Sequence, residues 1–268
     1  MSHSEWIHPS AIIEDGAEIA EGVRVGAFSI IGPNVKIGAE TEIGSHVVIN
    51  GHTSIGQRNK IFQFCSIGER PQDLTYDDQP TQVVIGDDNV IREYVSIHRG
   101  TLKQDKITKV GSSCLIMAHA HLGHDVVVGD HCVIVNSVNL AGHVTVEDRV
   151  IISGATNISQ FIRLGRGSYI GGASGVDRDI PPFCTAYGNR IKLKGVNIVG
   201  LRRQSFEKPL ISEAVDFFRT MEASPLSPRS FVDSSELMCE YESNEIVEEI
   251  SDFIKASRVG IAPFNFDV

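Results

Sequence analysis

The sequence predicts a parallel β-helix followed by a small helical domain. One observation is an aliphatic residue at every sixth position, running unbroken from Ile7 to Ile67 and again from Val110 to Val176. A second is that this period matches neither a β-strand, with a period of 2, nor an α-helix, with a period of 3.6. A third is that helical spacing replaces the repeat after Pro181 and Pro182. A six-residue period is typical of parallel β-helices.

Each six-residue unit is expected to form one short strand and a turn. Three units, about 18 residues, would close one triangular coil, and consecutive coils would stack about 4.8 Å apart. The aliphatic residues would then point inward and contact their equivalents above and below. A glycine often follows the aliphatic residue, as at Gly26 and Gly38, and we expect it to let the chain turn the corner.

Two segments interrupt the repeat, residues 73–84 and residues 103–109. Both are interpreted as loops that leave the solenoid, and loops on a rigid scaffold are where ligand contacts concentrate. The predicted domains are a β-helix over 1–190 and a helical domain over 191–268, which would cover the open end of the solenoid.

The helical domain is predicted from two amphipathic segments. Apolar residues follow helical spacing over 210–221 and over 246–253, and Pro225 and Pro228 separate the two segments.

Composition excludes several classes of protein. The formal net charge of −10 argues against a nucleic-acid-binding surface. The sequence has no apolar run long enough for a transmembrane helix, and its first residues do not resemble a secretory signal. The five cysteines are widely spread, which favours reduced thiols and a cytoplasmic location.

Histidines indicate where the chemistry lies, because six of the ten fall between residues 98 and 143. In the six-residue register His124, Gly142 and Gln160 occupy the same position of successive coils and would form one column. An imidazole can accept a proton from a hydroxyl near neutral pH, and a glycine N–H can stabilise an oxyanion. Asp125 could orient the imidazole only if the backbone turns between the two residues. His143 adjoins this strip, which suits acyl transfer.

Five strings are similar to one family. They are His46-Val47-Val48-Ile49-Asn50-Gly51-His52-Thr53, Ile97-His98-Arg99-Gly100-Thr101, His121-Leu122-Gly123-His124-Asp125, Leu140-Ala141-Gly142-His143-Val144 and Gly195-Val196-Asn197-Ile198. With them the chain resembles, from end to end, the UDP-N-acetylglucosamine O-acyltransferases of lipid A synthesis. The resemblance implies that the β-helix winds left-handed, that the enzyme is a homotrimer with active sites between subunits, and that it needs no metal or other cofactor.

The resemblance also implies substrates and roles. The donor would be a (R)-3-hydroxyacyl group on acyl carrier protein, and the acceptor the 3-hydroxyl of UDP-N-acetylglucosamine. His124 would be the general base, Asp125 its partner and Gly142 the oxyanion donor. The residues implied to hold substrate are Asp73, His98, His121, His143, Gln160, Asn197 and Arg203.

Gly172 is the residue that the resemblance implies as the acyl-chain ruler. It stacks one coil beyond Gly154, and a glycine there would leave room for a long, roughly myristoyl-length donor. Tyr169 could still shorten the groove, and Gly172 could simply turn a corner.

Four acceptor positions depart from the family's usual residues. They are Thr75 in place of lysine, Ser159 in place of histidine, Val199 in place of glutamate and Gln204 in place of the second arginine of an Arg-Arg pair. These departures leave open an acceptor with a 3-amino group, which would give an amide.

Three other readings of the repeat remain open. A metal-dependent hydrolase of the gamma-carbonic-anhydrase type would use His119 and His124, but its third histidine would stand where this chain has Val83. The N-acyltransferase of the same pathway carries an extra N-terminal domain, for which the repeat beginning at Ile7 leaves no room. A non-catalytic solenoid would lack turnover altogether.

Overall fold

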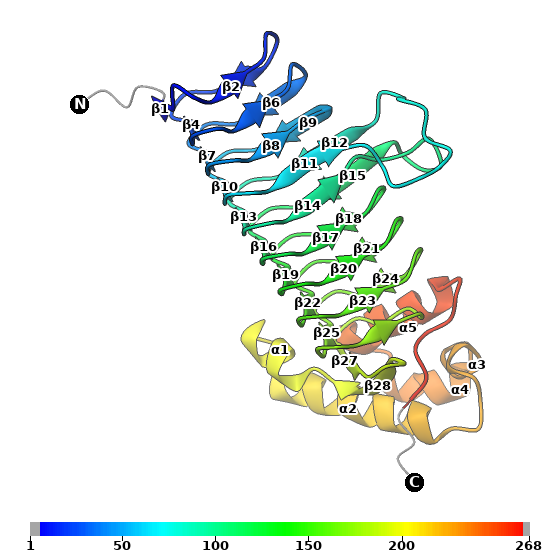
Figure 1. Ribbon diagram of the computed structural model, residues 1–268. Helices are drawn as coiled ribbons and strands as arrows, with labels where there is room; N and C mark the ends of the chain where they lie inside the picture. The colour runs from blue at the N-terminus through cyan, green and yellow to red at the C-terminus, as the bar shows by residue number, and fades with distance from the viewer. Residues whose placement is uncertain (1–5, 265–268) are drawn as a thin grey trace.

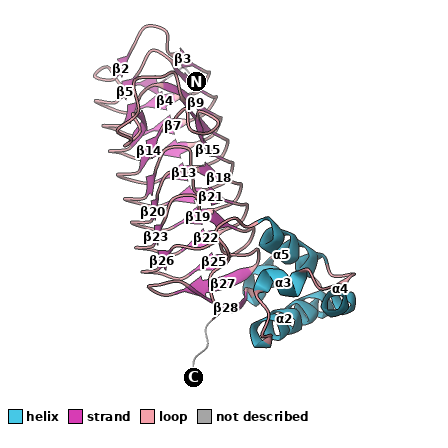
Figure 2. Cartoon of the chain, turned by 90° about the vertical axis from the view of Figure 1, so that its right-hand side faces the viewer, coloured by secondary structure: helices cyan, strands magenta, loops and turns pink. Residues whose placement is uncertain are grey.

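The chain forms a left-handed parallel β-helix with a helical domain at its C-terminal end (Figures 1 and 2). The computed structural model describes residues 6–264. Three parallel sheets make the faces of a triangular prism, and we name them sheets A, B and C. Successive strands in the sequence belong to successive faces, so each face receives every third strand.

Sheet A has eleven strands. In spatial order they are β1 (Trp6–Ile7), β4 (Arg24–Val25), β7 (Glu42–Ile43), β10 (Lys60–Ile61), β13 (Val90–Ile91), β16 (Leu115–Ile116), β19 (Val133–Ile134), β22 (Ile151–Ile152), β25 (Tyr169–Ile170), β27 (Cys184–Tyr187) and β28 (Lys192–Val196).

Sheets B and C have nine and eight strands. Sheet B contains β2 (Ile12–Ile13), β5 (Ile30–Ile31), β8 (Val48–Ile49), β11 (Ser66–Glu69), β14 (Ser96–His98), β17 (His121–Leu122), β20 (Asn139–Leu140), β23 (Asn157–Ile158) and β26 (Gly175–Val176). Sheet C contains β3 (Glu18–Ile19), β6 (Val35–Ile37), β9 (His52–Ile55), β12 (Gln82–Ile85), β15 (Ile107–Val110), β18 (Val127–Val128), β21 (Thr145–Val146) and β24 (Arg163–Leu164).

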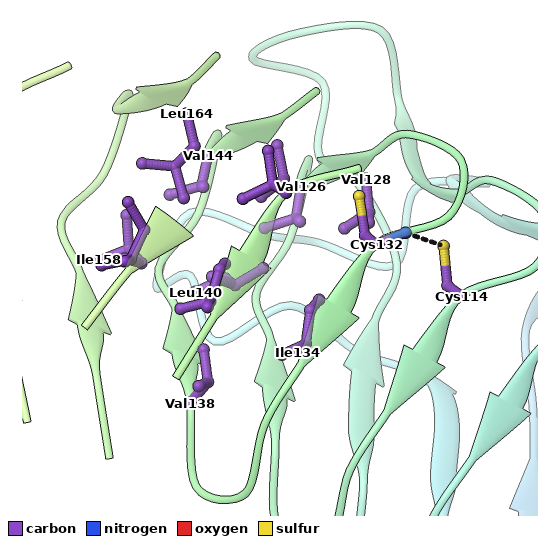
Figure 3. Close-up of a cluster of buried hydrophobic side chains, with 14 of the residues drawn as sticks. Cys114, Val126, Val128, Cys132, Ile134, Val138, Leu140, Val144, Ile158 and Leu164 are labelled. Carbon is purple, nitrogen blue, oxygen red and sulfur yellow. Dashed lines mark hydrogen bonds between the residues drawn. The ribbon is translucent and has the colours of Figure 1, made fainter. Parts of the chain in front are cut away.

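The six-residue register predicted from the sequence is confirmed by the strand pairing. Ile7 pairs with Val25, one predicted coil later, and the predicted inward residues from Val25 onward are almost all fully buried. Burying each such side chain contributes roughly 1.5–3 kcal/mol. Figure 3 shows this core around Ile134 and Leu140, where the Cys132 N–H donates to Cys114 Sγ at 3.4 Å. All five cysteines are free thiols.

The two interruptions leave the prism as loops, but both loops begin and end a few residues earlier than predicted. Strand β12 takes up residues 82–85 and β15 takes up residues 107–110, so the extruded segments are about 70–81 and 99–106. The predicted ends were wrong because Val83 and Thr108 are fully buried and pair with each other in strands β12 and β15, which are therefore longer than the repeat predicts.

The prediction that glycine turns the corners was also wrong. Most corners are made by non-glycine residues in the left-handed region, three residues after the aliphatic one, including bulky ones such as Phe28 (φ 59°) and Phe64 (φ 64°), and only a few by glycines such as Gly22 (φ 76°). Gly26 and Gly38 are required by close approach instead. A Cβ added to them would lie 2.6 Å and 2.5 Å from the carbonyl carbons of Gly44 and Gly56 on the next coil.

The C-terminal domain begins with an irregular addition to sheet A. Strand β27 continues the parallel sheet, whereas β28 pairs with β27 antiparallel, and helix α2 packs on β28 at the end of the prism (Figure 1). The helices are α1 (Ile198–Arg203), α2 (Lys208–Ala223), α3 (Pro228–Val232), α4 (Ser235–Met238), the 3-10 helix η1 (Cys239–Tyr241) and α5 (Glu245–Ala256).

The two predicted amphipathic segments are helices α2 and α5. Their buried residues include Ile211, Phe218, Ile246 and Ile250, as the helical spacing predicts. None of the helices within residues 6–264 is both long and apolar enough to cross a membrane.

Candidate active site

The corner that follows strand β17 holds a histidine–aspartate pair. Asp125 has a φ of 60°, which turns its side chain back toward the preceding residue, so that His124 Nδ1 lies 2.8 Å from Asp125 Oδ2. A carboxylate only accepts hydrogen bonds, so Nδ1 carries the proton and Nε2 keeps its lone pair. The turn that Asp125 needed in order to act as partner is therefore present.

Asp125 is almost fully buried and is held from three sides. Its Oδ1 accepts from the Thr101 N–H at 2.9 Å, its Oδ2 accepts from Thr101 Oγ1 at 2.7 Å, and its own N–H donates to Thr108 Oγ1 at 2.8 Å. Neither threonine was predicted from the sequence as part of the site. Thr101 lies in one of the strings that resemble the family, but the loop after it hides which coil it contacts.

Gly142 lies directly under the His124 imidazole, as the column predicted. A Cβ added at residue 142 would lie 2.5 Å from His124 Cε1 and 2.7 Å from Nε2. Within residues 6–264 the Gly142 N–H makes no hydrogen bond. The pair of His124 and Gly142 thus offers a proton acceptor and an unused donor side by side.

His143 occupies the corner position below Asp125. Its ring stacks on Phe161 with centroids 4.5 Å apart, and it meets His124 edge to face at 5.0 Å. Its Nδ1 lies 2.8 Å from Gln104 Oε1. Burial lowers the pKa of His143 despite the nearby carboxylate of Asp125, so the ring is neutral at pH 7.

His98 and His121 lie on the adjoining sheet B surface. Their rings meet edge to face at 4.9 Å, and His121 Nδ1 is 2.8 Å from Ser96 Oγ. Burial, followed by repulsion from His121, lowers the pKa of His98 to about 4. Burial likewise lowers the pKa of His121. His98 Nδ1 is buried without a partner in the described part of the chain, which suits a contact to a ligand.

Asp73 lies at the edge of this cluster, on the first loop. Its Oδ2 lies 2.5 Å from Lys103 Nζ on the second loop, and its Oδ1 accepts from the Thr75 N–H and hydroxyl at 2.9 and 2.7 Å. The hydrogen bond from Lys103, followed by those from Thr75, holds the pKa of Asp73 far below its usual range. Lysine at residue 103 thus supplies a cation beside Asp73, although residue 75 is not a lysine.

Four predicted site residues do not join this cluster within the single chain. Gln160 is exposed one coil beyond Gly142, in the predicted column. Asn197 caps helix α1, since its Oδ1 accepts from the Gly200 N–H at 3.0 Å and its amide donates to Gly167 O at 3.0 Å. Arg203 is exposed at the end of α1 and Gly172 is exposed beside β25, both toward the C-terminal end (Figure 1).

His124, Asp125 and His143 could together ligate a metal, because their ligand atoms lie within 4.8 Å of one another. However, both Asp125 oxygens already accept hydrogen bonds from Thr101, and Oδ2 also bonds His124. The Asp125 carboxylate therefore already has its hydrogen-bond partners without a cation. The position where a gamma-carbonic-anhydrase would need its third histidine is Val83, which is fully buried in the core.

A broad groove of about 1410 Å³ lies elsewhere, on the outer face of sheet A near the first coils. Its lining includes Trp6, Arg24, Lys60 and Phe62 and none of the predicted site residues. The His124 and Asp125 cluster thus lies outside that groove.

The comparisons with known proteins agree with this geometry. Residues 16–51 and 107–142 match the family of bacterial transferase hexapeptide repeats, and residues 179–262 match domain 2 of UDP-N-acetylglucosamine O-acyltransferase.

Relatives match over nearly the whole chain. An acyl-[acyl-carrier-protein]--UDP-N-acetylglucosamine O-acyltransferase of Syntrophobacter fumaroxidans is 44% identical, over 95% of this chain and 98% of its own. The structure of LpxA from Acinetobacter baumannii superposes with a TM-score of 0.91 at 41% identity, covering 96% and 99% of the two chains. The enzyme from Arabidopsis gives a TM-score of 0.70 at 30% identity, covering 98% and 99%. The chain is therefore an enzyme that belongs to the UDP-N-acetylglucosamine O-acyltransferase family.

Proposed function

We propose that the chain transfers a (R)-3-hydroxyacyl group from acyl carrier protein to the 3-hydroxyl of UDP-N-acetylglucosamine, with His124 as the general base. The observation that carries this proposal is the His124 imidazole, bound to Asp125 through Nδ1 and lying over the free N–H of Gly142. The names of the relatives supply the acyl carrier protein and UDP-N-acetylglucosamine, and the resemblance of the sequence implies the 3-hydroxyacyl group and the 3-hydroxyl.

The steps follow from the positions of these three groups. His124 Nε2 removes the proton of the acceptor hydroxyl, whose oxygen attacks the thioester carbonyl carbon. Asp125 stabilises the imidazolium that forms, and the Gly142 N–H donates to the oxyanion of the tetrahedral intermediate. The intermediate then expels the pantetheine thiolate, which takes the proton from His124. The products are the ester and the free carrier-protein thiol.

The direct test is turnover by purified protein with a 3-hydroxyacyl carrier protein and UDP-N-acetylglucosamine, read by mass spectrometry. His124→Ala should lower kcat by about 10³-fold or more, because general-base catalysis and the imidazolium both disappear. His131→Ala is a matched control, since His131 is an exposed corner histidine with no side-chain hydrogen bond in the described chain. Full activity of His124→Ala would refute the assignment of the base.

The nature of the acceptor's 3-substituent requires its own experiment. Thr75 donates to Asp73 rather than offering a cation, and Lys103 provides the charge instead. Both the 3-hydroxyl and the 3-amino forms of the sugar nucleotide should be supplied together. An alkali-labile product is the expected ester, whereas an alkali-stable amide would favour the 3-amino acceptor.

Gly172 supports a long acyl donor. Gly172 is exposed, and a Cβ added there would lie 3.2 Å from Gly154 O and 3.8 Å from Ser153 Cβ, so any larger residue would crowd this corner. Tyr169 lies beside it and is 3.1 Å from Ser153 Oγ through its hydroxyl. With a mixture of hydroxyacyl donors, we expect preference for roughly myristoyl length, and Gly172→Met should shift the preference to shorter chains. Preference of the unmodified enzyme for a short chain would overturn the role of Gly172.

We also propose that the enzyme is a homotrimer. An exposed ladder of stacked rings runs along the corner between sheets A and B, with centroids 4.7–5.3 Å apart; its members are Phe28, His46, Phe64, Tyr94 and His119. Phe28 is 60% exposed, and exposed aromatic patches of this kind are typical of protein interfaces.

A second copy is the expected occupant of this aromatic ladder, because Phe28, Phe64 and Tyr94 are exposed and stacked in one continuous row. Light scattering should give three times the chain mass of 29.2 kDa. Phe64→Asp should reduce that mass, and Val259→Asp, at an exposed apolar residue of the C-terminal domain, should not. A monomer at assay concentrations would refute the proposal.

A further inference from the structure

The second loop, residues 99–106, is fixed at both its root and its tip. At the root, Thr101 holds the catalytic carboxylate of Asp125 through its N–H and its hydroxyl. At the tip, Lys103 Nζ lies 2.5 Å from Asp73 Oδ2 on the first loop. A loop tied at these two points keeps the residue that follows Lys103 in a defined position beside the site.

That residue is Gln104, whose Oε1 lies 2.8 Å from His143 Nδ1. An amide oxygen can only accept, so His143 carries its proton on Nδ1 and its lone pair on Nε2. Burial keeps the pKa of His143 low, and the charged or titratable groups that face it are Asp125, His124, Lys103 and Asp73. The ring therefore has a single Nδ1 proton at neutral pH, and Gln104 takes it.

A competing acceptor for that proton is close. His143 Nδ1 lies 3.8 Å from Asp125 Oδ2, the same oxygen that accepts from His124 Nδ1 at 2.8 Å. His143 stacks on Phe161 at an interplanar angle of 5°, and a stacked ring can slide in its own plane. If Gln104 were absent, a small movement would bring His143 onto Asp125 Oδ2, where it would compete with the base.

We propose that Gln104 is a positioning residue for acyl transfer, which binds the His143 Nδ1 proton and so reserves Asp125 Oδ2 for His124. The proposal rests on the proposed function and deepens it. It assigns a role to a loop side chain that does not itself touch the reacting atoms. It also gives a reason for the tie between Lys103 and Asp73, which holds the loop tip in place.

Removing the amide tests the competition. Gln104→Ala should lower kcat about tenfold with little change in KM, because His124 keeps its place but shares its carboxylate. The acid limb of the kcat–pH profile should move to lower pH, since the His124 imidazolium loses part of its stabilisation. Asp105→Asn is the matched control, at an exposed residue of the same loop with no side-chain hydrogen bond within residues 6–264. It should match the unmodified enzyme.

Gln104→Glu supplies the conservative replacement. It keeps an acceptor at the same place, so kcat at pH 8 should recover to within about threefold of the unmodified enzyme. The new negative charge favours the protonated form of His124 as well as that of His143, so the acid limb should now move to higher pH, opposite to Gln104→Ala. If Gln104 had only a structural role, the acid limbs of Gln104→Ala and Gln104→Glu would not move in opposite directions.

The same variants separate this inference from the proposed function. If the unmodified enzyme turns over and Gln104→Ala retains its kcat and its pH profile, the role of Gln104 is refuted. If the unmodified enzyme has no turnover, the proposed function fails. In that case ¹⁵N NMR of His143 still tests whether Gln104 accepts its Nδ1 proton. The Nδ1-protonated tautomer should dominate in both proteins, because the amide oxygen and the carboxylate are both acceptors. The Nδ1 and Nδ1-proton chemical shifts of His143 should change in Gln104→Ala, as the acceptor changes from an amide to a carboxylate, and unchanged shifts would overturn the inference.

Discussion

Replacing Gly142 by alanine tests the catalytic geometry most directly. The new Cβ would lie 2.5 Å from His124 Cε1 and 2.7 Å from Nε2, whereas carbon atoms in contact normally stay about 3.5–4.0 Å apart. The imidazole must therefore move by about 1 Å. A misplacement of this size costs on the order of 10²-fold in rate, or about 2.7 kcal/mol of transition-state stabilisation. We expect kcat to fall by that factor.

The assay is steady-state acyl transfer, with thermal unfolding recorded in parallel. KM should change little, because the substitution acts on the reacting groups, and crowding should lower the stability by about 1–3 kcal/mol. Gly32→Ala is the control, since its Cβ would meet Asn50 Oδ1 at 3.1 Å and Ile49 O at 3.3 Å, far from the site. If Gly142→Ala kept kcat within threefold of the unmodified enzyme, the imidazole would not need the glycine and the reasoning would be refuted.

Three other predictions concern the supports of the site and of the fold. Thr101→Val removes a hydroxyl that donates to Asp125 Oδ2 at 2.7 Å, so kcat should fall about tenfold, and its recovery in Thr101→Ser would show that the hydroxyl is responsible. Burial lowers the pKa of His98 to about 4, so the unfolded chain, with a pKa near 6.5, binds the proton first. Stability should therefore fall by roughly 3 kcal/mol between about pH 6.5 and pH 4, and urea titrations should show a shallower fall for His98→Gln. Arg166 pairs with Glu249 of helix α5 and stacks over a core ring, so Arg166→Met should cost about 1 kcal/mol in urea unfolding; an unchanged midpoint would contradict this.

The repeat made the core predictable from sequence. One position in six is aliphatic and faces inward, and a side chain there has the same neighbours in each coil, so a single rule places the large buried aliphatic side chains of the prism. The same rule placed His124 over Gly142, because both residues stand at the same step of neighbouring coils. Helices α2 and α5 followed from their apolar spacing for the same reason, since burial of one face is what stabilises them.

The contacts made by the loops could not be predicted in this way. The residues of 99–106 have no place in the six-residue register, so nothing in the spacing brings Lys103 to Asp73 or Gln104 to His143. Strand β28 was missed because an antiparallel strand at the end of a parallel solenoid obeys a local pairing rule rather than the repeat. The sequence could say only that Asp125 would reach His124 if the backbone turned between them. That turn depends on a positive φ, which aspartate adopts at moderate cost.

The corner conformation explains why the proposed catalytic site draws on three successive coils rather than on one motif. Asp125, His143 and Phe161 all have φ between 60° and 65°, so each side chain folds back against the residue before it. In the first coil this brings a carboxylate onto His124. In the second it sets an imidazole beside Gly142, and in the third it sets a ring under that imidazole. A His-Asp pair at a corner with a larger residue below it would gain the hydrogen bond but lose the space that Gly142 leaves for the imidazole.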